Sequence, residues 1–129
     1  ARVGVAVEAV RPMPEADMVW PLSPAERASL ASMEGAARFD GFFRYWTLKE
    51  AFIKAVGTGV SLPLEDFDIS PPSPGEPRLL RLEGAADEPT RWRFAEHRPT
   101  RGYRAAVAAL TDGRGLVVKW HGSCLARPI

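Results

Sequence analysis

Apolar residues recur every three or four positions between Ala37 and Val56, and no proline interrupts this stretch. Such spacing is typical of a helix that packs one face against a core. Gly57, directly after the last apolar position, is a residue type that readily ends a helix with a positive φ angle. The pattern therefore predicts a long helix over residues 37–56, around which the rest of the domain is organised.

Residues 2–10 alternate instead, with a period of two. One side carries the three valines and the other carries small or acidic residues: Val3, Val5 and Val7 against Gly4, Ala6 and Glu8. This alternation predicts a strand whose β-branched valines are buried. Ala6 and Glu8 then project from the same face, where side chains at the two positions could share one cation.

The remaining elements follow from caps and breaks. Ser23, Pro24 and Glu26 form the pattern of a capping box with proline at the first helical position, which predicts a short helix that ends near Met33. Further strands are expected at residues 66–69, 78–82, 91–96, 103–110 and 116–120. The order predicts the α+β class, with a long helix packed on an antiparallel sheet, in a single domain over residues 1–129.

Bulk properties narrow the possible functions. Seventeen basic and sixteen acidic residues give a net charge of +1, so charge provides no argument for a nucleic-acid partner. No apolar run is long enough for a membrane span. Cys124 is the only cysteine, which excludes an intrachain disulfide and indicates the cytoplasm. The chain opens at Ala1 without an initiator methionine, and we therefore expect it to be part of a longer protein.

Glu50 and Lys54 lie four residues apart, and hence on one face of the long helix. Spacing alone allows two interpretations. The first is a surface ion pair that contributes about 0.3–0.5 kcal/mol. The second is a metal-binding carboxylate beside a phosphate-binding lysine. The chain has only three lysines and two of them, Lys49 and Lys54, fall in this helix, which favours a specific role for them.

Two motifs extend the pattern. Residues 46–54 read W-T-x-K-E-A-x-x-K and are followed by G-x-G-x-S-L-P-L, while residues 4–8 read G-V-A-V-E. The combination resembles the 4′-phosphopantetheinyl transferases of the Sfp type, in their C-terminal half-domain. The resemblance is close over residues 2–70 and weaker through Leu110.

The resemblance implies a Mg²⁺-dependent transfer of 4′-phosphopantetheine from coenzyme A to a serine of an apo acyl or peptidyl carrier protein. By the same resemblance, Glu8 and Glu50 are metal ligands, and Lys49 and Lys54 contact coenzyme A phosphates. Glu50, assisted by Lys54, or a metal-bound water would deprotonate the acceptor serine.

Ala6 departs from the family pattern, because an aspartate that binds the metal is expected there. A methyl group cannot bind a cation, so either the aspartate was replaced deliberately or the chain is a natural homologue with reduced activity. The alternative function is a catalytically inactive homologue that binds coenzyme A or a carrier protein.

The resemblance covers one of the two halves of an Sfp-type enzyme. It therefore implies a second half-domain as partner, supplied by another chain, by a missing N-terminal half or within a megasynthase.

Other candidate residues receive weaker support. His97 and His121 are isolated and lack metal-ligand spacing, and Gly57-Thr58-Gly59 lacks the ending of a phosphate-binding loop. Five arginines cluster late in the chain: Arg91, Arg93, Arg98, Arg101 and Arg104. They form either a solvated sheet face or a docking surface for an acidic carrier protein.

Overall fold

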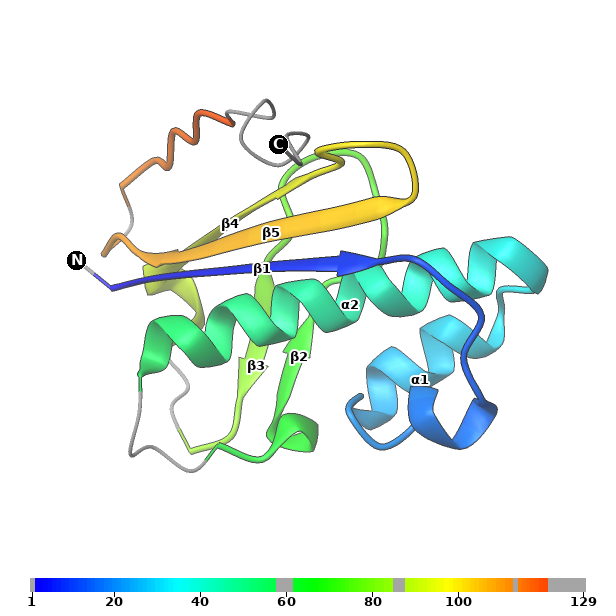
Figure 1. Ribbon diagram of the computed structural model, residues 1–129. Helices are drawn as coiled ribbons and strands as arrows, with labels where there is room; N and C mark the ends of the chain where they lie inside the picture. Colours follow the sequence, from blue (N-terminus) through cyan, green and yellow to red (C-terminus); the bar gives the residue numbers. More distant parts are fainter. Residues whose placement is uncertain (1, 58–61, 85–87, 113, 121–129) are drawn as a thin grey trace.

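The computed structural model describes residues 2–57, 62–84, 88–112 and 114–120. Its elements, in chain order, are β1 (Val3–Ala9), the 3-10 helix η1 (Glu15–Met18), α1 (Pro24–Ala31), α2 (Gly35–Val56), η2 (Leu64–Asp66), β2 (Phe67–Ile69), β3 (Leu79–Leu82), η3 (Glu88–Arg91), β4 (Trp92–His97) and β5 (Tyr103–Leu110). The long helix α2 lies along the sheet that contains β1 (Figure 1). The predicted α+β architecture is therefore confirmed.

The strands form two antiparallel ladders. The larger sheet has the order β1-β5-β4, and the smaller one pairs β2 with β3. The strand predicted at residues 116–120 is wrong, because residues 114–120 form neither helix nor strand. The chain turns away from the sheet after Leu110, where Asp112 has a φ of 52°. Trp120 instead stacks on His97 of β4, with ring centroids 4.6 Å apart.

The two faces of β1 are reversed relative to the sequence prediction. Val3, Val5 and Val7 are 55%, 47% and 41% exposed, whereas Gly4 and Ala6 are buried against α2. A Cβ atom added at Gly4 would lie 2.0 Å from the Ala51 carbonyl oxygen, so helix and strand approach too closely for a larger side chain. The prediction of buried valines is wrong because this close approach requires the smallest residues on the inner face.

The outer face of the sheet is apolar on β1 and β5, and one of its rows stays apolar as far as β4. Cross-strand rows on this face join Val5, Val107 and Ala95, and flanking rows begin at Val3 and Val7. An antiparallel sheet with one side on a helix usually presents polar residues on the other side. Here the outer side is aliphatic on β1 and β5, and Arg93 and His97 of β4 are its polar positions.

The ends of the helices agree with their sequence signals. Ser23 and Glu26 form the predicted capping box at the start of α1. Gly57 follows α2 with a φ of 102°, and its N–H donates to the Ile53 carbonyl. No helix in the described part of the chain combines the length and the hydropathy needed to cross a bilayer. Thr58, Gly59, His121 and Cys124 lie outside the described residues.

Candidate functional site

The structure brings Glu8, Glu50 and Lys54 together. The carboxyl groups of Glu8 and Glu50 lie within hydrogen-bonding reach of each other, and the Lys54 charge acts on Glu50. The Lys54 ammonium is anchored at the edge of β1, where it donates to the Val5 carbonyl at 3.2 Å. Two motifs more than 40 residues apart in sequence therefore meet in one polar group, which we call the acid pair (Glu8 and Glu50) with its lysine.

Local structure explains why the acid pair forms. Glu8 follows Gly4 and Ala6 on the inner face of β1, and α2 packs directly beneath that face. Ala51, which takes part in the close contact with Gly4, is next to Glu50 in the helix. The small inner residues therefore bring the strand near enough for the two carboxyl groups to meet.

The electrostatics of the acid pair are unfavourable for ionisation. Burial, the hydrogen bond with Glu8 and the charge of Glu8 together raise the pKa of Glu50 to about 7, and the nearby Lys54 only partly opposes this shift. The Oε1 atom of Glu50 is buried and has no hydrogen-bond partner in the structure. A buried acceptor without a partner is costly, and such atoms are concentrated where a ligand supplies the missing contact.

The donor set of the acid pair can be tested against a divalent cation. Within the described residues, no group of three or more His, Cys, Asp or Glu side chains has an arrangement suited to a metal. Ala6 is buried and contributes only a methyl group at the third position. Mg²⁺ is nevertheless commonly held by one or two carboxylates together with waters and substrate phosphates. The carboxyl groups of Glu8 and Glu50 fit such a site, and the unpartnered Oε1 atom of Glu50 is available as a ligand.

Lys49 does not reach this group. Its side chain is fully buried, and its ammonium donates to Glu26 Oε1 at 2.6 Å and to the carbonyl oxygens of Leu64 and Phe67. An ammonium has three N–H donors, and these three acceptors use all of them. The expected contact with coenzyme A phosphates does not fit this arrangement, because adjacent residues of a helix point about 100° apart.

Arg11 belongs near the acid pair but received no role from the sequence. Its Nη1 atom lies 3.6 Å from Glu8 Oε1, and its guanidinium lies 4.8 Å from the centroid of the Phe43 ring. The only available signal was a basic residue three positions after Glu8. The proline-rich connector that contains Arg11 gave no indication that the chain would hold the guanidinium beside the strand.

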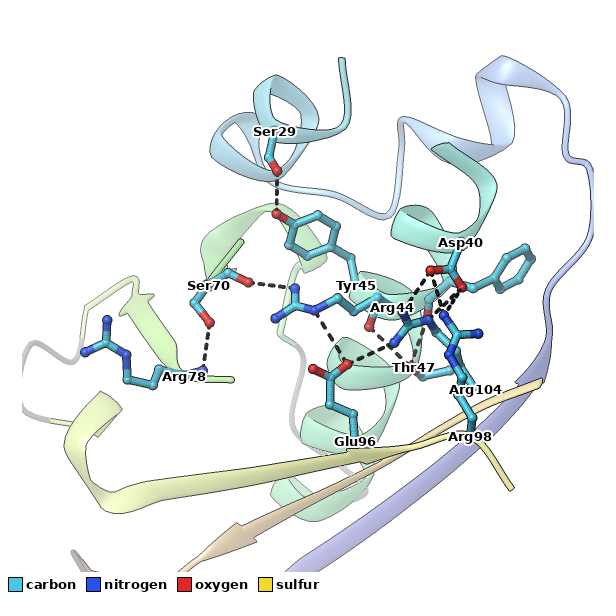
Figure 2. A network of polar contacts seen from close by, with 11 residues as sticks. Ser29, Asp40, Arg44, Tyr45, Thr47, Ser70, Arg78, Glu96, Arg98 and Arg104 are labelled. Atoms are coloured by element: carbon cyan, nitrogen blue, oxygen red, sulfur yellow. Dashed lines mark hydrogen bonds and ion pairs between the residues drawn. The ribbon is translucent and has the colours of Figure 1, made fainter. Parts of the chain in front are cut away.

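The arginine cluster is mostly neutralised by the chain itself. Arg98 and Arg104 both pair with Asp40 of α2, and Arg104 also reaches Glu96 (Figure 2). These contacts hold the pKa of Asp40 below its usual value.

The other paired members are Arg91, with Asp112 and Glu88, and Arg93, with Glu76. Charges compensated in this way do not form a strong basic docking surface.

One sizeable cavity lies away from the acid pair. A cavity of about 740 Å³ lies between β3 and β4, and its lining includes Leu80, Trp92 and the Glu76–Arg93 ion pair. None of the predicted site residues lines it. The acid pair is the better candidate for the functional site, because the pKa of Glu50 is raised and its buried Oε1 atom has no hydrogen-bond partner in the structure.

Comparison with known proteins identifies the family. The model of the 4′-phosphopantetheinyl transferase superfamily matches residues 2–108. The 4′-phosphopantetheinyl transferase HetI of Nostoc is 33% identical over 93% of this chain and 48% of its own length. The L-aminoadipate-semialdehyde dehydrogenase-phosphopantetheinyl transferase of rat is 38% identical over 56% of this chain and 25% of its own length. The chain thus spans half or less of the length of these relatives.

Solved structures share the fold. The holo-[acyl-carrier-protein] synthase of Thermotoga maritima superposes with a TM-score of 0.64 at 23% identity, over 86% of this chain and 63% of that protein. A holo-(acyl-carrier-protein) synthase of Bacillus anthracis, solved in complex with CoA (3′,5′-ADP), gives a TM-score of 0.63 at 21% identity. That superposition covers 86% of this chain and 96% of the other.

Proposed function

The chain belongs to the 4′-phosphopantetheinyl transferase superfamily, and from this membership we propose that it transfers the phosphopantetheine arm of coenzyme A to a serine of an apo carrier protein. The observation that carries the proposal is the meeting of Glu8 and Glu50, with Lys54 beside them. The two carboxyl groups come from the strand motif and the helix motif, respectively. A phosphoryl-transfer site needs such convergence, because its catalysis depends on positioning and on charge neutralisation.

Each residue of the group has a separate task in this proposal. Glu8 and Glu50 hold Mg²⁺, which when bound supplies positive charge to the substrate phosphates. Lys54 binds a phosphate oxygen through the N–H donors that its contact with Val5 leaves available. The serine oxygen attacks the phosphorus that carries the pantetheine arm. The bond between that phosphorus and the bridging oxygen breaks, and the nucleotide leaves with the bridging oxygen. Glu50 also accepts the proton of the serine hydroxyl.

Ala6 weakens the metal site without removing it. Two carboxylates and the substrate phosphates remain as ligands, so the expected result is lower metal affinity and slower transfer. The second candidate function is an inactive homologue that binds coenzyme A or the carrier protein. The buried methyl of Ala6, on the same face as Glu8, is the specific observation that favours it.

We propose that a second half-domain covers the outer face of the sheet. Val3, Val5 and Val7 of β1 are exposed on this face and form an aliphatic surface that a separate body can bury. The chain spans 48% of the length of HetI, which leaves room for such a body in a full-length protein. A lone cysteine favours a reducing compartment, and we place the protein in the cytoplasm.

The transfer reaction is tested by the mass of an apo carrier protein incubated with coenzyme A, Mg²⁺, this chain and an N-terminal half from a longer relative. We expect a mass gain of one phosphopantetheine arm, and we expect Ala6→Asp to accelerate the gain by about 10–100-fold. Ala6→Asn is the matched control, since it adds similar bulk without the charge. An Ala6→Asp chain that folds and yet transfers no faster than Ala6→Asn would contradict the proposed role of this position.

The partner surface is tested separately, by association. Val5→Asp places a charge in the centre of the exposed valines and should abolish binding to the supplied half-domain while the melting temperature stays unchanged. Leu80→Asp is the matched control, because Leu80 is equally exposed, at 48%, but lies on β3. Equal binding by both variants in analytical ultracentrifugation would show that the valines are not the contact surface.

A further inference from the structure

Lys49 and Glu26 form a buried ion pair on the side of α2 away from the acid pair. Their side chains are 0% and 1% exposed, and the Lys49 ammonium lies 2.6 Å from Glu26 Oε1. The same ammonium donates to the carbonyl oxygens of Leu64, at the start of η2, and Phe67, at the start of β2. Lys49 therefore links α1 and the β2 region to α2.

Glu26 completes this arrangement from the other direction. Its Oε1 atom accepts the Ser23 N–H at 2.8 Å, and its Oε2 atom accepts the Ile69 N–H at 2.7 Å. The carboxylate is thus at once the capping-box residue of α1 and an anchor for β2. We call Lys49, Glu26 and their four backbone partners at Ser23, Leu64, Phe67 and Ile69 the clamp.

The clamp lies directly beside the acid pair in sequence. Lys49 precedes Glu50, and Ala51 follows it. On the Ala51 side, α2 is pressed against Gly4 so closely that no Cβ atom fits between them. Helix α2 is therefore held on both sides of Glu50, by a polar contact at one neighbour and by a backbone contact at the other.

We infer that the clamp is a positioning device for the acid pair: it sets the rotation of α2 about its axis so that Glu50 points toward Glu8, and Lys49 contacts no phosphate. The catalytic value of this positioning rests on the proposed function. The contacts of the clamp themselves are present whether or not the chain catalyses transfer. A rotation of about 10–20° is the range beyond which a catalytic arrangement loses its productive geometry. Two contacts that flank Glu50 are well placed to keep α2 within that range.

A double variant separates positioning from stability. Glu26→Leu combined with Lys49→Met replaces the ion pair by apolar side chains of similar size, a change that is often neutral or stabilising for buried pairs. Residual dipolar couplings of the α2 amides then report the orientation of the helix relative to β1. We expect the double variant to fold with a lower melting temperature, because backbone groups of Leu64, Phe67 and Ile69 lose their partners, and we expect α2 to rotate by about 10–20°. A folded double variant with unrotated α2 would overturn the inference.

Arg44→Met is the control for the loss of a buried cation from the same helix. Arg44 is only 4% exposed and donates to the Ser70 carbonyl at 2.7 Å (Figure 2). Its other partner, Glu96, keeps its contact with Arg104 after the substitution. We expect this variant to lower the melting temperature without rotating the helix around Glu50. Equal rotation in both variants would show that any loss of a buried cation has this effect, and would overturn the inference.

A second measurement needs no variant and decides the case if the double variant does not fold. The ammonium resonance of Lys49 is followed in the parent chain while inorganic pyrophosphate is added. A clamp residue keeps its resonance unchanged, and a shift at Lys49 would show phosphate contact and overturn the inference. Because neither readout involves transfer to a carrier protein, failure of the proposed reaction with rotation observed would remove the transferase and leave the clamp.

Discussion

Lys49 and Glu50 are neighbours in one helix, yet they belong to polar groups of opposite character. Lys49 meets the opposite charge of Glu26 and donates to two backbone carbonyl oxygens, those of Leu64 and Phe67. Glu50 meets a like charge, and one of its oxygens is buried without a hydrogen-bond partner in the structure. The hydrogen-bonding groups of Lys49 find their partners within the chain, whereas Glu50 keeps an acceptor that a bound ligand can use. The difference separates a structural ion pair from a candidate binding site more clearly than either motif does.

The pKa values show the same contrast. Burial raises the pKa of Glu26 and lowers that of Lys49, but the attraction between the two charges opposes both changes. At Glu50, burial and the neighbouring Glu8 act in the same direction, and only Lys54 opposes them. We therefore expect substitutions at the two neighbouring positions to change stability in opposite directions.

The largest effect is expected from Lys49→Met. This change leaves the Glu26 carboxylate buried without its cation, which costs about 3–5 kcal/mol of unfolding free energy for pairs of this kind. Urea unfolding at pH 7 measures the loss. Lys54→Met is the control, since that side chain is exposed and its removal should change stability by less than about 0.5 kcal/mol. Equal effects of the two changes would contradict the distinction between the clamp and the site.

A smaller loss is expected from Gly4→Ala, which acts on both groups at once. The added methyl would meet the backbone oxygen of Ala51 at 2.0 Å and the backbone nitrogen of Ala55 at 2.5 Å. Because backbone atoms of a helix cannot move independently, strand and helix must separate, at a cost of about 1–3 kcal/mol. Gly115→Ala is the matched control, because nothing lies within 4 Å of its added Cβ. Thermal unfolding of the two variants should differ clearly.

The smallest effect, and the only gain, is expected from Glu50→Gln. An acid whose pKa rises on folding, here from 4.5 to about 7, favours the folded state most when both states are protonated. Its contribution is therefore lost as the pH rises from about 4.5 through 7. Above pH 7 the glutamine variant should be more stable than the parent by about 1–2 kcal/mol, since partial contact with water screens this carboxyl group.

Thermal unfolding between pH 4.5 and 8 tests this sign. The two chains should converge at the acid end and separate at the alkaline end. Glu34→Gln, at an exposed position, should show no such pH dependence. A parent chain that is more stable than Glu50→Gln at pH 8 would show that the acid pair is not strained.

The sequence predicted the acid pair but not the contacts of its neighbour. Glu8 and Glu50 were paired because the strand motif and the helix motif resemble those of the family, whereas periodicity alone placed the valines, and not Glu8, toward the core. Lys49 was given a role from the motif, and its burial beside Glu26 depends on the packing of α1, which no local pattern describes. The valines of β1 were assigned to the wrong face for a similar reason. Alternation shows that two faces differ, but the helix that covers one of them lies more than 30 residues away.

By itself the sequence determined the α+β class, the capped ends of the helices and the order of the two motifs, because these depend on interactions between residues close in the chain. Only the tertiary structure decided which face of β1 meets α2, which of two adjacent side chains enters the interior and which turns toward Glu8. Those outcomes depend on how closely one backbone can approach another. Here a glycine in the first strand, with no side chain to hold the helix away, sets that distance.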